Sequence, residues 1–419
     1  MSKNYPNRSL RNCTIAEISS GLRENGVVAG RVIGILDGEG EMPGFDNSKR
    51  GYLLQDESGR VLVLAENFPN VGNIIEVEVR GAAEGVKEIG EKTVLAACED
   101  FYIGAGAPNF LKMIIDEGLR DKLRKRGEII EEIRRFFMAR GFLEIDTPSL
   151  VRYPGQEPYL DVFKTEFSAR HEGEEIHDDL YLITSPEYSL KKYLAGGFEK
   201  IFQIGKSFRN KETFSKLHNP EFTMLEWYRA YASYLEIMDD TEELVKYLFE
   251  KFAPDWPQIL EKWDRMTVEE VFQKFANSEV PENEEEFFEL FLNQIEPHLG
   301  IEKPVIIYDY PISMAALSKR SESGEVAERF EVYIAGMEIC NAFSELNDPR
   351  EQADRLNKEK SQRGKMGKEV YDVDPKFIDA LKMGMPPSGG NALGVDRLIM
   401  LLLKENSIEK ILPFPYKDL

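Results

Sequence analysis

Residues 202 to 228 contain the side chains with the clearest chemical potential in this sequence. Arg209 ends an apolar run, a short polar loop follows, and His218, Phe222 and Glu226 accompany a second apolar run. An arginine can bind a phosphate or a carboxylate through paired hydrogen bonds, and an aromatic ring can stack on a purine. Two apolar runs joined by a polar loop predict an antiparallel hairpin. A surface hairpin with a buried phenylalanine is the alternative interpretation.

Two other segments extend this pattern. Residues 127–150 predict a long helix followed by a strand that ends near Pro148, and residues 389–403 predict a glycine-containing strand that runs into a helix with Arg397 near its start. With the hairpin between them, the three segments resemble motifs 1, 2 and 3 of the class II aminoacyl-tRNA synthetases, in the lysine-type form. The resemblance covers about residues 109–416.

The composition sets limits on the protein class. A chain of 419 residues predicts two or three domains, and no apolar run reaches the ~18 residues that a membrane span needs. The N-terminus lacks the apolar core of a signal peptide. Cys13, Cys98 and Cys340 are few and far apart, which favours a cytoplasmic protein without a disulfide framework, and four histidines leave little material for a zinc site.

The net charge of −22 argues against RNA binding by bulk charge. Residues 119–135 are the best candidate for a local basic patch, but a solvated helix face with ion pairs between successive turns is the favoured interpretation.

The chain divides into two expected domains. Residues 1–104 contain short β-rich runs separated by turn residues, a pattern typical of a small barrel that resembles an OB-fold. Residues 105–419 contain the three motifs, and the resemblance implies an antiparallel sheet flanked by helices, with the active site on the sheet face. The expected fold class is α+β. A GxxxxGK[ST] phosphate loop is absent.

The resemblance implies a nucleotide site for ATP. Arg209 would bridge an amino-acid carboxylate and the α-phosphate, and Arg397 would contact the γ-phosphate side and the adenine. Phe222 would stack on the other adenine face, with His218 near the phosphates. Lys211 stands where the family has a glutamate, so Glu212 is expected to take over that role. A structural ion pair is the alternative for Arg397, which follows Asp396, and plain core packing is the alternative for Phe222.

The resemblance also implies a Mg²⁺ site at Glu331 and Glu338, supported by Glu226. The two positions are seven residues apart, so a regular strand would point them to opposite faces. A bulge or a turn at Gly336 is therefore needed to aim both at one metal.

The amino-acid pocket follows from the same resemblance. Glu187 matches the residue that binds the α-amino group, Asn341 lies near the carboxylate, and Phe343 would pack on the aliphatic stem. Tyr228 and Glu345 match the pair that reads the ε-amino group of lysine, because a buried ammonium needs both an opposite charge and hydrogen bonds. An N-cap role before residues 347–352 is the alternative for Glu345.

Two branches of the family differ in the acceptor. Lysyl-tRNA synthetases load tRNA, and the shorter elongation factor P ligases load lysine or (R)-β-lysine onto a protein lysine. The segments around Glu187, Glu221 and residues 380–386 resemble the ligases, as does Ala392, where synthetases usually carry glycine. The N-terminal barrel and Ser344 point toward the synthetases.

The expected barrel differs from an anticodon-reading domain at three positions. Ile35, Gly51 and Thr93 align near the positions that read a lysine anticodon, and none can stack on or pair with a base in the same way. Tyr52 would restore stacking if the alignment is off by one residue.

The sequence thus predicts an ATP-dependent, lysine-activating ligase that forms a homodimer through the first motif. The favoured acceptor is a lysine of an elongation factor P-like protein, and tRNA is the alternative. A non-catalytic binder that kept the fold is a third hypothesis, because a fold alone does not prove activity.

Overall fold

The computed structural model describes a defined part of the chain. The described residues are 26–36, 51–56, 60–64, 74–83, 86–96, 112, 116–171, 174–212, 215–315 and 317–419. They fall into two compact units that divide at Glu117. The predictions for Cys13 and Cys98 lie outside the described residues. Within them, Cys340 is a free, buried cysteine.

The first unit contains a closed barrel of five strands in the order β1-β2-β3-β5-β4. Tyr52 is fully buried within it, so its ring is not available to stack on a base. The strands are β1 (Gly26–Leu36), β2 (Gly51–Gln55), β3 (Arg60–Leu64), β4 (Ile74–Ala83) and β5 (Val86–Ala96).

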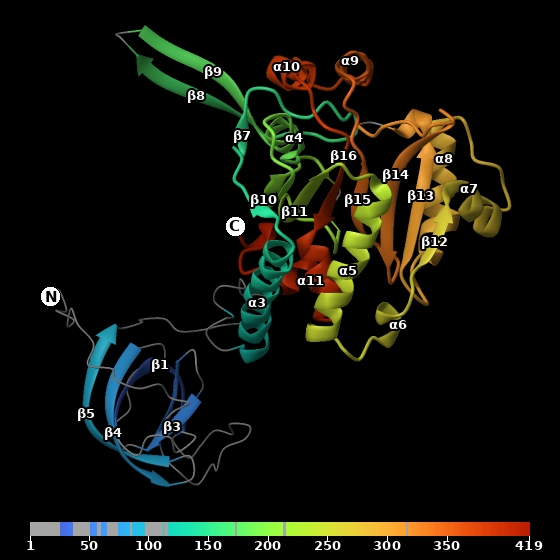
Figure 1. Cartoon of the computed structure of the whole chain (residues 1–419). Coiled ribbons are helices and arrows are strands. Elements are labelled where there is room, and N and C mark those ends of the chain that lie inside the picture. Colours follow the sequence, from blue (N-terminus) through green and yellow to red (C-terminus); the bar gives the residue numbers. More distant parts are fainter. Residues whose placement is uncertain are drawn as a thin grey trace. The chain divides into compact units, whose positions relative to one another are not determined.

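The second unit is built on a sheet of eight strands in the order β12-β13-β14-β15-β16-β11-β10-β6 (Figure 1). Its central pairs are antiparallel, whereas the edge pairs β12–β13 and β10–β6 are parallel, which makes the sheet mixed. The strands are β6 (Leu143–Glu144), β10 (Lys200–Phe208), β11 (Glu221–Ala230), β12 (Asp264–Thr267), β13 (Val305–Pro311), β14 (Val326–Ile334), β15 (Met337–Ser344) and β16 (Ser388–Gly394). The α+β fold predicted for this unit is confirmed.

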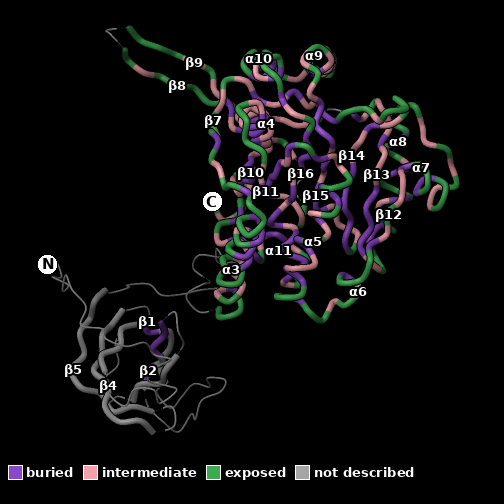
Figure 2. The backbone as a smooth tube through the Cα atoms, in the orientation of Figure 1, coloured by how far each residue is buried: buried purple, intermediate pink, exposed green. Residues whose placement is uncertain are grey.

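One face of the sheet packs on helices that bury the main hydrophobic core (Figures 1 and 2). The helices that contribute to this core are α3 (Glu117–Ala139), α5 (Tyr234–Phe252), α6 (Pro257–Leu260) and α11 (Val395–Leu402). Alternate strand residues such as Leu225, Trp227, Val332 and Leu393 point into it, because side chains of a strand alternate between the two faces.

A second hydrophobic cluster packs α4 (Glu187–Ala195), α9 (Pro349–Lys365) and α10 (Pro375–Met383) together with sheet residues such as Ile201 and Tyr228. Helix α4 ends at Gly196, as the sequence predicts. The two short helices α7 (Val268–Val271) and α8 (Glu284–Leu290) pack beside the β12–β13 edge.

A three-stranded sheet in the order β7-β9-β8 forms a separate arm that extends from this unit (Figure 1). Its strands are β7 (Leu150–Val151), β8 (Lys164–His171) and β9 (Glu174–Leu182). Most side chains of β8 and β9 are exposed (Figure 2).

Helix α3 carries the basic segment at 119–135, and several of its cations are already paired. Arg126 lies 2.6 Å from Asp396, Lys122 lies 2.6 Å from Glu405, and Arg134 lies 2.8 Å from Glu144. These pairs agree with the interpretation of an ion-paired helix and not with a basic patch open to RNA. Among the described helices, none is long and apolar enough to cross a membrane.

Candidate active site

The structure brings the predicted site residues together, with the exception of Glu226, which does not line the cavity. They line a single cavity of about 1150 Å³ in the second unit. The predicted residues among its walls are Glu187, Arg209, Glu212, His218, Phe222, Tyr228, Glu331, Glu338, Asn341, Phe343, Glu345, Ala392 and Arg397. Their common location agrees with one binding site, while their individual roles remain predictions.

The register of the central strands explains why these residues meet. Directly opposite residues of an antiparallel pair point to the same face of a sheet. One row across four strands therefore shares a face, and its members are Glu226, Ala392, Asn341 and Glu331. The next row on that face consists of Tyr228, Gly390, Phe343 and Arg329.

The hairpin between β14 and β15 supplies the irregularity that the sequence required. Its turn contains Ala335 and Gly336, which both have positive φ angles, 52° and 74°. The register then shifts, so that Val332 pairs with Cys340 but Tyr333 pairs with Glu338. The extra residue on β15 is a bulge, and it places Glu338 on the same face as Glu331.

Arg209 follows the last residue of β10 at one end of the cavity. Its backbone N–H donates to the carbonyl of Pro220 at 3.0 Å, which closes the hairpin, and its guanidinium lies 5.1 Å above the ring of Phe222. Its Nε is buried and makes no hydrogen bond with the described residues. Arg209 therefore has a donor to offer an anion.

The loop after Arg209 places Glu212, and not Lys211, at the cavity. Glu212 lies 3.6 Å from Arg209, whereas Lys211 is largely exposed and has a φ of 56°. This geometry agrees with the prediction that Glu212 takes the position of the glutamate that Lys211 replaced.

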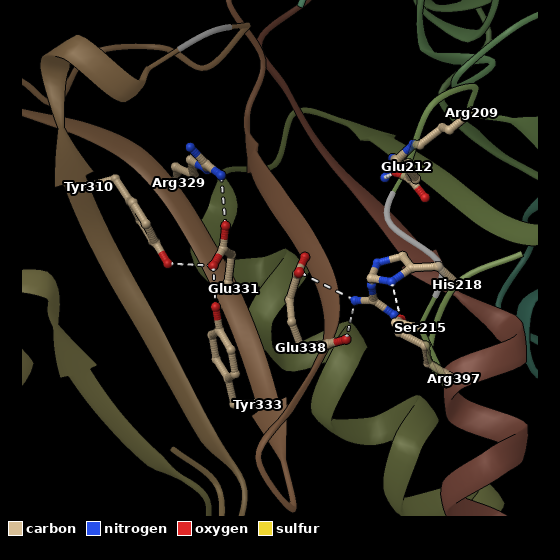
Figure 3. Close-up of polar contacts among 10 residues, drawn as sticks. All are labelled: Arg209, Glu212, Ser215, His218, Tyr310, Arg329, Glu331, Tyr333, Glu338 and Arg397. Atoms are coloured by element: carbon tan, nitrogen blue, oxygen red, sulfur yellow. Dashed lines mark hydrogen bonds and ion pairs between the residues drawn. The ribbon is translucent and has the colours of Figure 1, made fainter. Parts of the chain in front are cut away.

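Arg397 lies in the first turn of α11 and faces the same end of the cavity (Figure 3). It donates to the backbone carbonyl of Glu338 at 2.8 Å and to Nε2 of His218 at 3.0 Å. Asp396 pairs instead with Arg126 and accepts a hydrogen bond from the backbone of Thr223, so the structural ion pair considered for Arg397 does not form with its neighbour.

His218 orients Arg397. Burial and the adjacent Arg397 lower the pKa of His218, so its imidazole is neutral near pH 7. Because Nε2 accepts from Arg397, Nδ1 carries the proton and donates to the hydroxyl of Ser215 at 2.6 Å.

The carboxylates of Glu331 and Glu338, the predicted metal ligands, differ in how many hydrogen bonds they already accept. Glu331 accepts hydrogen bonds from the hydroxyls of Tyr310 and Tyr333 at 2.7 and 2.8 Å and from Arg329 at 2.7 Å (Figure 3). Glu338 has one longer contact, with Arg397 at 3.4 Å, and its side chain is more exposed than that of Glu331. Burial, together with Glu331, raises the pKa of Glu338.

A site of this kind fits Mg²⁺. Among the described residues, no group of three or more His, Cys, Asp or Glu could enclose a metal. Mg²⁺ commonly takes only one or two carboxylates together with substrate phosphates and water. Glu338 and Glu331 fit that requirement, with Glu338 as the more accessible ligand.

The other end of the cavity is acidic. Glu345 is 1% exposed, and its Oε1 makes no hydrogen bond with the described residues. A Cβ at Gly390 would lie 2.2 Å from that oxygen and 2.5 Å from Tyr228, so only glycine lets the two side chains meet here. Burial raises the pKa of Glu345 to about 8.

Glu226 lies below this acidic end and not beside the metal pair. Its two oxygens accept hydrogen bonds from Ser185 at 2.6 Å and Tyr228 at 3.0 Å, and burial raises its pKa to about 8. The expected supporting role toward Mg²⁺ stays a prediction, and both carboxylate oxygens of Glu226 already have partners within the chain. Because Tyr228 donates to Glu226, its oxygen remains an acceptor for an ammonium group.

Two alternatives from the sequence are excluded by hydrogen bonds. The N-cap of α9 is Asp348, which accepts from the backbone of Arg350 and Glu351, so Glu345 has no capping role. Ser344 is buried on the opposite face and accepts a hydrogen bond from the backbone of Tyr234 at 2.9 Å. It does not line the cavity, so it has no direct contact with a bound substrate.

Sequence reasoning missed two cations of the site. Lys191 lies one helical turn after Glu187 and contacts both Glu187 and Glu345. Arg329 precedes Glu331 by two residues on β14 and donates to Asn341 at 3.0 Å. The i,i+4 spacing in the helix and the i,i+2 spacing in the strand were the available signals.

The chain is similar to proteins of one known family. Residues 107–418 match the family of tRNA synthetases class II (D, K and N). An "Elongation factor P--(R)-beta-lysine ligase" of Erwinia tasmaniensis is 40% identical over 309 residues, which cover 70% of this chain and 94% of the relative. The protein of the same name from Hamiltonella defensa is 37% identical with the same coverage. A "Lysine--tRNA ligase" of Magnetococcus marinus is 34% identical over 423 residues, which cover 86% of this chain and 82% of the relative.

Proposed function

The chain belongs to the class II tRNA synthetases (D, K and N), and we propose that it is an ATP-dependent ligase that activates lysine or β-lysine and transfers it to a lysine side chain of elongation factor P or a similar protein. One observation carries the activation step. A single cavity has two arginines and an aromatic ring at one end and buried carboxylates at the other. A diamino acid and ATP have the complementary charges.

The proposed first step is attack of the amino-acid carboxylate on the α-phosphorus of ATP. A new oxygen–phosphorus bond forms, the bond to the bridging oxygen breaks, and pyrophosphate leaves. Arg209 would hold the carboxylate and the α-phosphate together, since the guanidinium can pair with both anions. Arg397, oriented by His218, would bind the phosphates that leave. Mg²⁺ held by Glu338 and Glu331 would supply further neutralisation of phosphate charge.

The proposed second step forms an amide. The neutral amine of the acceptor attacks the carbonyl carbon of the adenylate, the bond between that carbon and the phosphate oxygen breaks, and AMP leaves while the amine loses a proton. The acidic end of the cavity would hold the substrate's ammonium groups throughout, with Glu187 on the α-amino side and with Glu345 and Tyr228 on the ε-amino side.

The acceptor proposal is supported by the relatives named as elongation factor P ligases, at 37–40% identity. Ala392 lies on the cavity wall beside Asn341, where one methyl group changes the space near the substrate's α-carbon.

Charging of tRNA is the second candidate, and one observation favours it. The second unit makes up about 72% of the chain, so a match that covers 86% must include part of the first unit. The matches to the elongation factor P ligases cover only 70%. We propose that residues 1–104 form an OB-fold-like domain before a catalytic domain of residues 105–419, since the OB-fold is a five-stranded barrel. We also propose a homodimer through the region around α3.

Exchange of labelled pyrophosphate into ATP tests the activation step. The intact chain should catalyse exchange with lysine or (R)-β-lysine, and the same reaction without amino acid is the control. Exchange with neither would contradict the proposed function. A preference of tenfold or more in kcat/KM would identify which of the two is the substrate.

A further inference from the structure

Lys191 is a fully buried cation at the acidic end of the cavity. It lies on α4, and its Nζ is 2.6 Å from Oε1 of Glu187 and 2.5 Å from Oε2 of Glu345. The same ammonium lies 5.3 Å from the centre of the Phe343 ring. The chain thus supplies its own ammonium group to two of the carboxylates that would receive the substrate.

The arrangement leaves part of each carboxylate free for another cation. Lys191 does not line the cavity itself, whereas Glu187 and Glu345 both do. Oε1 of Glu345 is buried against Gly390 and makes no hydrogen bond with the described residues. A buried carboxylate oxygen without a donor costs free energy, and a substrate ammonium would supply the missing donor.

The charges at this end explain why an internal cation is needed. Three carboxylates, those of Glu187, Glu226 and Glu345, repel one another in a buried space. Burial raises the pKa of Glu345 the most, Lys191 lowers it, and Glu187 and Glu226 raise it further. Burial alone would lower the pKa of Lys191, but Glu187 and Glu345 raise it above its usual value, so Lys191 is charged.

We propose that Lys191 is a positioning and specificity-determining residue, which offsets the repulsion between Glu187 and Glu345 so that both present negative charge to an amino acid with two ammonium groups. This inference rests on the proposed function. One ammonium from the chain faces three carboxylates, so two carboxylates are left for the two ammonium groups of the substrate once binding has released the protons that burial holds on Glu226 and Glu345.

The test compares lysine with norleucine, which has the same chain length but lacks the ε-ammonium. In Lys191→Met, a side chain of similar volume removes only the charge. We expect KM for lysine at pH 7 to rise by about tenfold or more, and the ratio of kcat/KM for lysine to that for norleucine to fall by a similar factor, because one pKa unit on Glu345 corresponds to tenfold in its ionised fraction.

The pH dependence of kcat/KM for lysine distinguishes the loss of the Lys191 charge from a general loss of structure. We expect the rise of kcat/KM for lysine with pH to move to higher pH in Lys191→Met, because the carboxylates then release their protons less readily. KM for ATP should stay unchanged. Lys192→Met is the matched control, since it breaks an ion pair of the next residue with Asp374 and should leave the lysine profile unchanged.

Three outcomes would overturn the inference. An unchanged lysine-to-norleucine ratio and pH profile would mean that Lys191 has a structural role only. A lower KM for lysine would mean that Lys191 competes with the substrate for the carboxylates. The same shift in Lys192→Met would mean that any lost ion pair on α4 has this effect.

A second variant keeps the test available if Lys191→Met does not fold, since removal of one partner from a buried ion pair is strongly destabilising. The double variant Lys191→Met/Glu345→Gln removes both charges. We expect this double variant to fold and to lose the preference for lysine over norleucine. Its kcat/KM for lysine should also lack the rise with pH that ionisation of Glu345 causes. Retention of the wild-type preference would contradict the inference. Absence of exchange with both lysine and (R)-β-lysine in the unchanged chain would contradict the proposed function itself.

Discussion

The two ends of the cavity are opposite in charge and in how that charge is held. At the nucleotide end, Arg209 and Arg397 are partly exposed, and Arg209 keeps an unused donor. At the amino-acid end, Glu226 and Glu345 are almost completely buried, and the chain's own Lys191 is the counter-ion of Glu345 and Glu187. The nucleotide end can therefore bind anions from solution, whereas at the amino-acid end an internal cation stabilises the buried carboxylates. We therefore expect that substitutions at one end impair activation by ATP and that substitutions at the other end impair selection of the amino acid.

Removal of Arg209 should have the largest effect. In Arg209→Ala, we expect pyrophosphate exchange to fall by about 10²–10³, the loss typical when one donor to developing charge is removed. Calorimetric binding of lysine in the absence of ATP should weaken much less than exchange, because only the contact to the lysine carboxylate is lost and the acidic end still binds the ammonium groups. A non-catalytic binder would instead show no exchange in the unchanged chain, and its partner binding would survive the substitution.

Glu345→Gln tests the other end. We expect KM for lysine to rise by about 10²-fold, because loss of one partner of a buried charge pair commonly costs ~2–5 kcal/mol. KM for ATP should stay within twofold. An equal rise in both constants, measured by pyrophosphate exchange, would show that the two ends are not independent.

Gly390→Ala probes the meeting of Glu345 and Tyr228. The new methyl group would overlap both side chains, and overpacking of this kind costs ~1–3 kcal/mol. We expect a rise of about tenfold or more in KM for lysine. Gly394→Ala is the control on the same strand, because its nearest neighbour would be at 3.7 Å. Equal kinetics of the two variants would contradict the described packing.

The pH dependence should report the acidic end. Glu226 and Glu345 have pKa values raised to about 8, so ionisation of both is complete only above that pH, and the ionised forms bind an ammonium group best. We expect KM for lysine to fall severalfold between pH 7 and pH 8.5, with proton release on binding measured in two buffers. Uptake of protons would contradict this assignment.

The raised pKa values of Glu226 and Glu345 also make the stability of the folded protein depend on pH. A folded-state pKa above the unfolded value means that the folded protein holds the proton more tightly. The contribution to stability is therefore present below the unfolded pKa of about 4.5 and is lost as the pH rises through about 8. In Glu226→Gln, the thermal midpoint of the ligand-free protein should fall less steeply across this range.

The smallest expected effect concerns Ser344. Its hydroxyl accepts one hydrogen bond from the backbone of Tyr234, so Ser344→Ala should cost ~1 kcal/mol of stability. Kinetics with lysine and the identity of the acceptor should not change. A change in acceptor would show that this residue acts on the site from the opposite face.

The sequence predicted the parts of the site that lie within short motifs. The hairpin around Arg209, the strand-to-helix turn before Arg397 and the helix after Glu187 depend on local patterns, and each occurs where the patterns indicated. The need for an irregularity between Glu331 and Glu338 also followed from the two-residue period of a strand.

The rest depended on register and burial, which a single sequence does not specify. The bulge lies after Glu338 and not at Gly336, and that position decides which face Glu338 occupies. Glu226 was assigned to the metal because nothing local shows that Ser185 and Tyr228 occupy its two oxygens. Lys191 was overlooked because a lysine on a helix is normally exposed.

The chemical nature of the bond between the amino acid and its acceptor decides whether the acceptor is a protein lysine or tRNA. Labelled lysine or β-lysine, ATP and the enzyme are incubated with an extract of the source organism, and the acid-precipitated label is treated with protease, RNase or mild alkali. We expect label that protease removes and that RNase and alkali leave, because an amide on a protein lysine resists mild alkali. Label removed by RNase and by alkali would be an ester on tRNA and would contradict the proposed acceptor.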